Sequence, residues 1–263
     1  MSDLHGTALE ITPVPAFSDN YLWLLSRGRH AAIIDPGDAA PVERVLAERG
    51  LQLSAILVTH HHADHVGGLA ALRAGGATVY GPRGEEIAGV DVRLGGGDRI
   101  EVLGTEFEVI DTPGHTAGHI SYFSAATRPP LLFCGDTLFA CGCGRLFEGT
   151  PAQMLASLDR LAALPGPTRA YCAHEYTEAN IRFALAVEPG NAGLQERARD
   201  AAALRARGEP TVPSTIALER ATNPFLRADE PAVRAAAVAH DPGAAAGRVQ
   251  TFATLRAWKN VFR

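Results

Sequence analysis

A seven-residue segment at positions 59–65, THHHADH, carries four histidines and an aspartate, which are side chains that bind catalytic metal ions. His60 and His62 point to the same side if the segment is extended, because side chains alternate along a strand. Asp64 and His65 face a second point nearby if the chain turns into a helix close to Asp64. Two pairs of ligands that face adjacent points predict two adjacent metal ions.

Three more candidate ligands follow apolar, strand-like runs further along the chain. His115 lies in the Gly/Pro turn DTPGHTAGH, Asp136 ends the run LLFCGD, and His174 ends the run RAYCAH. Each could by itself be a structural capping group. Because active groups of α/β proteins lie beyond the carboxyl ends of strands, we expect the three to converge and complete the ligand set. His61, which lies between two outward-pointing ligands, is predicted not to bind metal.

The chemistry of these ligands limits the metal and suggests how two ions are held. Asp136 is predicted to bridge them, because a carboxylate has two oxygens and an imidazole has one nitrogen free for ligation. Imidazoles and carboxylates without a thiolate suit zinc, and also iron or manganese. Asp35 and His119 are predicted to hold ligand rings in the right tautomer, although either could be merely structural.

Apolar patterns predict the strands and helices that position these side chains. Strands are predicted at residues 53–59, 77–80, 107–111, 119–124, 130–134 and 168–172, and helices at 39–49, 65–75 and 150–164. A strand meander is predicted between Leu9 and Asp35. Beyond Glu175, Ala/Arg/Leu helical patterns dominate. The sequence therefore predicts an α/β domain at residues 1–175 and a helical domain at residues 176–263.

The composition is that of a globular protein, with 46% hydrophobic residues, 20% charged residues and a net charge of -5. Residues 177–263 carry a net charge of +3, which is too little to predict nucleic-acid binding. No apolar run reaches membrane-spanning length, and residues 1–15 lack the pattern of a secretory signal. A cytoplasmic monomer without membrane contact is expected, with its four cysteines as reduced thiols.

The motifs resemble those of the metallo-β-lactamase superfamily. They are the T-H-x-H-x-D-H segment, the downstream P-G-H-T, the strand-end G-D-T and the late A-H-E-Y. The resemblance covers roughly residues 1–175 and implies a four-layer αββα sandwich, in which two sheets lie between outer helices and the metals lie at one edge. The expected fold class is therefore α/β (α+β) with a C-terminal helical domain.

A narrower resemblance extends over essentially the whole chain. The runs CGRLFEGT, AHEYT, NPFLR and LRAWKN, which begin at Cys143, Ala173, Asn223 and Leu255, are similar to those of hydroxyacylglutathione hydrolases, the glyoxalase II family. This resemblance implies hydrolysis of the thioester S-D-lactoylglutathione to D-lactate and glutathione, the second step of methylglyoxal detoxification.

The same resemblance implies four substrate-binding side chains, Arg145, Tyr176, Arg256 and Lys259. The last two would hold the glycine carboxylate of glutathione, and the first two would contact the tripeptide backbone. Arg256 and Lys259 are neighbours on one helix face, and paired cations suit a carboxylate, although an ordinary solvated face is the alternative. Phe147 stands where some members carry a tyrosine, and Asn260 stands where an acid is common. Both departures bear on affinity more than on chemistry.

The hypothesis for the reaction is that a hydroxide bridging the two metals attacks the thioester carbonyl while one metal polarises its oxygen. Metal coordination lowers the pKa of water from about 16 to about 7, so no separate base is required. Asp64 could orient the hydroxide with its spare oxygen, and Asp136 would hold both metals. A thiol with a pKa of about 8.5 leaves readily, so no general acid is required.

Other interpretations stay open. On the same fold, the chain could be a β-lactamase, a ribonuclease or a mononuclear iron persulfide dioxygenase. However, exported lactamases need a signal segment, and a ribonuclease needs a strongly basic groove. The dioxygenases typically lack the helical tail. In a different class, it could be a redox di-iron module or a structural zinc clamp. Cys134, Cys141 and Cys143 could suggest a sulfur cluster, whereas the family resemblance places them in a loop and a strand interior. No G-x-S-x-G elbow supports serine chemistry.

Overall fold

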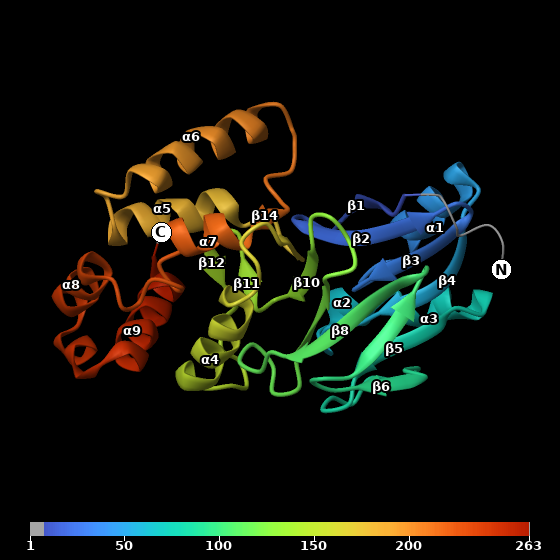
Figure 1. The fold of residues 1–263 in the computed structure, drawn as a ribbon, viewed down its shortest axis with the longest axis horizontal. Helices are drawn as coiled ribbons and strands as arrows, with labels where there is room; N and C mark the ends of the chain where they lie inside the picture. The colour runs from blue at the N-terminus through green and yellow to red at the C-terminus, as the bar shows by residue number, and fades with distance from the viewer. Residues whose placement is uncertain (1–7, 263) are drawn as a thin grey trace. The chain divides into compact units, whose positions relative to one another are not determined.

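The computed structural model describes residues 8–262 (Figure 1). The chain divides into two compact units. Unit 1 comprises the chain up to Asp111 together with Ala117–Gly135, and unit 2 comprises Thr112–Thr116 together with the chain from Asp136 onward. A domain boundary at residue 175 stays a prediction. The expected cytoplasmic location was based on residues 1–15, and residues 1–7 of that segment lie outside the described residues. No helix within residues 8–262 is long and apolar enough to cross a membrane.

Unit 1 holds most of the strands. Its elements are β1 (Glu10–Ala16), β2 (Asn20–Arg27), β3 (His30–Ile34), α1 (Ala39–Arg49), β4 (Gln52–Leu57), α2 (Ala63–Val66), α3 (Leu69–Leu72), η1 (Arg73–Gly75), β5 (Thr78–Pro82), β6 (Val92–Leu94), β7 (Arg99–Val102), β8 (Thr105–Asp111), β9 (Ile120–Ser124) and β10 (Leu131–Gly135). One sheet has the order β1-β2-β3-β4-β5-β6, antiparallel up to β3 and parallel from there. A second sheet has the antiparallel run β10-β9-β8-β7.

Alternation along the strands builds the core of unit 1. Leu24 of β2 and Ile33 of β3 are fully buried in a cluster with Val42 of α1 and Leu69 of α3, so these helices cover one face of the first sheet. Tyr122 of β9 donates a hydrogen bond of 2.8 Å to the carbonyl oxygen of Val58, which links the second sheet to the chain just beyond β4. Burial of this phenol raises its pKa well above the usual value. The meander and the helix after Asp38 are confirmed.

The single helix predicted over residues 65–75 is wrong, because the segment forms α2, α3 and the short η1 instead. Two glycines explain the break. A Cβ on Gly67 would lie 2.5 Å from the carbonyl oxygen of Gly37, and one on Gly68 would lie 2.6 Å from that of Pro36. The backbone passes so close to the loop after β3 that only glycine fits, and a continuous helix would have to move away from that loop.

Unit 2 is mostly helical, as predicted for the tail. Its elements are β11 (Leu138–Phe139), β12 (Gly142–Cys143), α4 (Pro151–Ala162), β13 (Arg169–Cys172), α5 (Thr177–Val187), α6 (Ala192–Ala206), β14 (Ser214–Thr215), α7 (Ile216–Thr222), α8 (Pro231–His240), η2 (Pro242–Ala246) and α9 (Arg248–Val261). The predicted start of α4 is confirmed by a capping box between Thr150 and Gln153. Helices α5 and α6 lie side by side (Figure 1). Ile181 and Ala184 of α5 belong to one buried cluster with Leu194 of α6. The prediction of no strand beyond residue 175 is wrong only for the two-residue β14, which pairs with β13.

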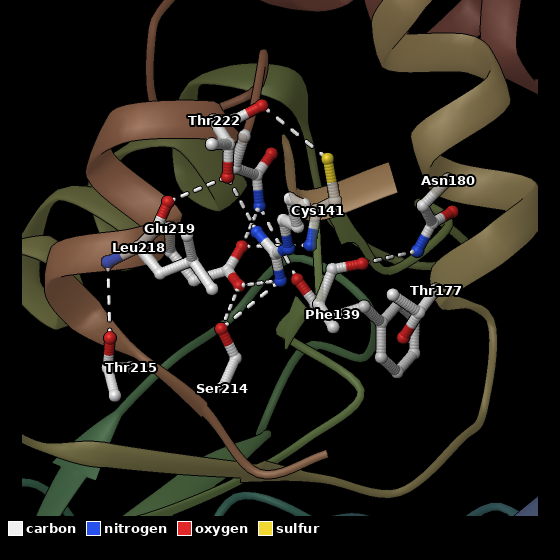
Figure 2. A network of polar contacts seen from close by, with 12 residues as sticks. Phe139, Cys141, Thr177, Asn180, Ser214, Thr215, Leu218, Glu219 and Thr222 are labelled. Carbon is white, nitrogen blue, oxygen red and sulfur yellow. Dashed lines mark hydrogen bonds and ion pairs between the residues drawn. The ribbon is translucent and has the colours of Figure 1, made fainter. Parts of the chain in front are cut away.

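A buried ion pair ties α6 and α7 to the β11–β12 hairpin, and Figure 2 shows the polar network around its carboxylate, Glu219. Arg197 of α6 donates to Glu219 of α7 at 2.5 Å, and both side chains are almost fully buried. Glu219 also accepts hydrogen bonds from the hydroxyl of Ser214 and, at 2.8 Å, from the backbone N–H of Cys141. A buried carboxylate is tolerated only when such donors replace water. The helices therefore set the conformation of the hairpin, which lies between Asp136 and Arg145.

We expect Arg197→Met to lower the free energy of unfolding by about 3–5 kcal/mol, because it leaves Glu219 buried without its cation. Urea titration at neutral pH measures the loss. Arg199→Met on the same helix is the matched control, since that arginine is exposed. Equal stabilities of the two variants would contradict a stabilising role for the buried pair.

Candidate functional site

In unit 1 the histidine-rich segment leaves β4 and enters α2, so its side chains gather within a few ångströms. His62 Nδ1 lies 3.1 Å from His60 Nε2, and the rings of His60 and His65 have centroids 4.0 Å apart. His65 Nε2 lies 3.6 Å from Asp64 Oδ2. His60 and His65 are fully buried. The turn into a helix that was predicted near Asp64 is confirmed, and the four predicted ligands of this segment form one cluster.

Asp35 follows β3 in a left-handed conformation, with φ at 50°, and organises the base of this cluster. Its carboxylate accepts from the N–H and the hydroxyl of Thr59 at 2.7 and 2.8 Å, and its Oδ2 lies 3.1 Å from His65 Nδ1. The Thr59 hydroxyl also lies 3.0 Å from His60 Nδ1. These contacts on Nδ1 leave Nε2 of both rings directed away from Asp35. His119 stacks on His60 with ring centroids 4.9 Å apart.

Two further side chains in unit 1 bear on the cluster. Asn20, at the start of β2 and 5% exposed, donates to Asp64 Oδ2 at 3.1 Å. Asn20 was not predicted from the sequence, although it is a polar side chain at the start of the apolar run NYLWLLS. His61 Nδ1 lies 2.9 Å from Oε2 of the buried Glu85. His61 thus has a carboxylate partner, and its role as a non-ligand stays a prediction.

In unit 2 the three remaining predicted ligands meet around one carboxylate. His115 Nε2 lies 3.3 Å from Asp136 Oδ2, and His174 Nε2 lies 3.4 Å from Asp136 Oδ1. All three side chains are buried. Each carboxylate oxygen thus faces a different imidazole, which is the arrangement expected of a bridging ligand.

Backbone geometry in unit 2 holds this group in place. His115 Nδ1 lies 2.9 Å from the carbonyl oxygen of Arg145, so its other nitrogen is the one that faces Asp136. Gly114 has a φ of 149°, which favours glycine, and its neighbour here is Met154 of α4. A Cβ on Gly144 would lie 1.9 Å from the carbonyl oxygen of Asp136. The glycines beside these ligands are therefore required by close backbone approach.

The donor atoms in both clusters fit divalent metal ions of the zinc, iron or manganese type, since they are imidazole nitrogens and carboxylate oxygens. Thiolates do not fit this pattern. Burial raises the pKa of Cys141 and of Cys172 to about 12, and that of Cys143 is raised for the same reason. All four cysteines are buried and free of disulfides, as predicted. The candidate metal-binding groups among the described residues contain histidines and carboxylates and no cysteine.

The predicted substrate-binding cations lie in unit 2 without acidic partners. Arg256, only 6% exposed, donates to the carbonyl oxygen of Cys143 at 2.7 Å and to Asn260 Oδ1 at 3.1 Å. Lys259 Nζ donates to the carbonyl oxygen of Ala179 at 3.2 Å. Within residues 8–262, neither cation has a carboxylate within 4.0 Å. The buried Arg256 rules out the alternative of an ordinary solvated helix face at this position.

Further cations and two exposed aromatic rings surround these groups. The pKa of Lys259 is lowered by burial and then by the positive charges of Arg256, Arg182 and Arg145. Arg182 was missed in the sequence, where an exposed arginine on a helix looks like any solvated side chain. Tyr176 stacks on His174 with ring centroids 4.7 Å apart, and Phe147 meets His115 edge-on at 5.3 Å. Unit 2 thus carries cations and aromatic surface beside its imidazoles.

The amino-acid sequence matches two known family models. Residues 17–88 and 73–174 match the family model of the metallo-beta-lactamase superfamily, and residues 175–262 match that of the hydroxyacylglutathione hydrolase C-terminus. A hydroxyacylglutathione hydrolase of Cupriavidus taiwanensis is 58% identical over 266 residues, which cover 97% of this chain and 100% of the relative. One from Pseudomonas paraeruginosa is 57% identical over 258 residues, with the same coverage.

Solved structures agree on the fold. The crystal structure of ETHE1 from Myxococcus xanthus has a TM-score of 0.65 and 27% identity, covering 94% of this chain and 89% of that one. TTHA1623, crystallised in a di-iron-bound form, has a TM-score of 0.52 and 29% identity, covering 63% of this chain and 91% of that one. The α+β fold of the metallo-β-lactamase superfamily, extended by a helical region, is therefore confirmed. The chain belongs to the metallo-β-lactamase superfamily and, within it, to the hydroxyacylglutathione hydrolases.

Proposed function

We propose that this protein hydrolyses 2-hydroxyacyl thioesters of glutathione, such as S-D-lactoylglutathione, to glutathione and a 2-hydroxy acid. The observation that carries the proposal is in unit 2, where the two oxygens of Asp136 face two different imidazoles. The same unit bears Arg256 and Lys259, which pair with no carboxylate among residues 8–262. Metal ions held by these ligands would promote attack on the thioester. The cations would bind a carboxylate of the glutathione part of the substrate. The match of relatives of that name over the full length supports both parts.

We propose that seven side chains hold two divalent metal ions: His60, His62, Asp64, His65, His115, Asp136 and His174. Zinc fits the ligand set, and so do iron and manganese. The di-iron-bound form of a relative supports a binuclear centre. When bound, such ions lower the pKa of coordinated water to about 7 and polarise a carbonyl oxygen.

The residues of the chain would orient the reactants around that chemistry. Asp64, held by Asn20, would orient the attacking water, while Asp35 keeps His65 in the tautomer that leaves Nε2 for the metal. Asp136 would bind both ions through its two oxygens. The leaving glutathione thiolate needs no proton from the protein. A thiol has a pKa of about 8.5, so its thiolate is a good leaving group.

We propose that glutathione binds along unit 2. Arg256 and Lys259 would hold its glycine carboxylate, and Arg145 and Tyr176 would contact the peptide backbone. A carboxylate would accept hydrogen bonds from the guanidinium of Arg256, and its negative charge would offset the mutual repulsion of the cations. Phe147 offers a ring but no hydroxyl for contact with glutathione. Asn260 accepts a hydrogen bond from Arg256, whereas an acid at this position would compete with the substrate carboxylate for that cation. We also propose that the protein acts as a cytoplasmic monomer.

Chelation tests the function. We expect the purified protein to release thiol from S-D-lactoylglutathione, to lose this activity when a chelator removes its metal, and to regain it with zinc, iron or manganese. Elemental analysis before and after chelation supplies the metal count. Full thiol release by a metal-free protein would refute the proposal. Oxygen consumption with glutathione persulfide, without thiol release from the thioester, would identify the rival persulfide dioxygenase instead.

The genetic arm of this experiment is Asp136→Ala, which we expect to lower metal content and to reduce turnover about 100-fold or more, because both ions lose a ligand. Asp200→Ala is its control, since Asp200 is exposed on α6. Normal metal content in Asp136→Ala would exclude the bridging role.

Gly37→Ala tests the geometry of the unit 1 cluster. The added Cβ would lie 1.8 Å from the carbonyl oxygen of Asp64 and must displace the backbone of that ligand. We expect metal affinity to fall about 10- to 100-fold, as it does when ligand orientation is lost. Competition with a metal-sensitive dye measures the affinity. Gly75→Ala, at a position with open space around it, is the control, and matching affinities would show that Asp64 tolerates the shift.

Lys259 predicts a pH dependence of substrate binding. Its pKa is lowered, so its ammonium loses the proton as pH rises through a value below the usual range of about 10.4. We expect KM for the anionic substrate to begin to rise at a pH below the usual lysine pKa of about 10.4. The variant Lys259→Arg stays charged there and should abolish the rise. An unchanged KM profile in this variant would show that Lys259 does not bind the substrate carboxylate.

A further inference from the structure

Two stacked phenylalanines lie in the core of unit 2 beneath the substrate-binding cations. Phe183 of α5 and Phe225, just beyond α7, have ring centroids 5.8 Å apart and an interplanar angle of 20°. Both side chains are fully buried. Phe225 belongs to the N-P-F-L-R run noted in the sequence, and the proposed hydrolysis by itself assigns it no role.

Each ring faces a different cation of α9. The Arg256 guanidinium carbon lies 5.1 Å from the centroid of Phe225, and Lys259 Nζ lies 5.8 Å from that of Phe183. Both distances are within the range of about 6 Å in which the negative face of an aromatic ring attracts a positive charge. The stacked pair therefore offers two adjacent faces to two adjacent cations.

The two cations need such support because their own surroundings are unfavourable. They are like charges one helical turn apart, Arg256 is almost fully buried, and its Nε has no hydrogen-bond partner. Desolvation and repulsion both oppose this arrangement. An acidic partner would relieve the strain, but it would also neutralise the site and compete with any incoming carboxylate. An aromatic face stabilises a cation without neutralising it.

We propose that Phe183 and Phe225 form a positioning platform, which holds Arg256 and Lys259 side by side and leaves their charge available to the substrate carboxylate. The platform rests on the proposed function, since it assigns the recognition of glutathione to these cations. The backbone acceptors Cys143 and Ala179 fix the ends of the two side chains, and the rings fix where their charges lie. The rings touch neither substrate nor metal in this role.

The test compares two phenylalanine-to-leucine variants in the same core. Phe225→Leu removes the face beneath Arg256. Phe252→Leu removes an equally buried ring that packs edge-on against Phe225, with centroids 5.8 Å apart, and carries no cation. We expect both to lose similar thermal stability. Only Phe225→Leu should raise KM for S-D-lactoylglutathione and weaken calorimetric binding of glutathione, each about 3- to 30-fold, with kcat unchanged.

A double-mutant cycle separates the platform from general packing. In an Arg256→Met background, Phe225→Leu should no longer alter glutathione binding, because the cation it supports is gone. Phe183→Leu tests the second face through Lys259 and serves if Phe225→Leu fails to fold. Equal KM values for the Phe225 and Phe252 variants, or an undiminished effect in the Arg256→Met background, would overturn the platform. A wild-type protein that releases no thiol from the thioester would instead refute the proposed function.

Discussion

The contact of one buried carboxylate with two imidazoles is the interaction on which the rest of this site depends. Asp136 directs one oxygen to His115 and the other to His174, although the two histidines are far apart in the sequence. A carboxylate can do this only if its backbone is held rigidly, because both oxygens turn together. The close packing of Gly144 against the carbonyl of Asp136, and the hydrogen bond from His115 to the carbonyl of Arg145, provide that rigidity.

The segment that follows Asp136 links the proposed metal ligands to the proposed substrate-binding side chains. It forms the β11–β12 hairpin, and helical side chains hold its backbone at several points. Glu219 accepts from the N–H of Cys141, Asn223 donates to the carbonyl of Gly142 at 2.9 Å, and Arg256 donates to the carbonyl of Cys143. The helical region thus supplies the cations that we propose to bind the substrate, and it also fixes the hairpin that leads from Asp136 to Arg145. Arg256 takes part in both.

Local patterns were sufficient for the elements with strong periodicity. Strands β4, β8, β9, β10 and β13 and helices α1 and α4 lie close to their predicted bounds, because apolar runs and capping residues mark them. The short strands β6 and β7 were missed, since β7 alternates exposed and buried residues over only four positions. The predicted helix after His65 is divided by Gly67 and Gly68, and the reason lies in a loop some thirty positions earlier in the chain, roughly the length of a βαβ unit.

The sequence by itself determined the chemistry available to this protein. The residue types and spacing in THHHADH, and the histidines and aspartate that end later strands, predict the metal ligands, because alternation along a strand and the turn into a helix are local rules. Only the tertiary structure decided that Asn20 donates to Asp64, that Asp35 lies beside His65, and that Arg256 is buried over an aromatic ring. These contacts join positions far apart in the chain, and burial and packing, which no local pattern encodes, determine which of the possible partners meet.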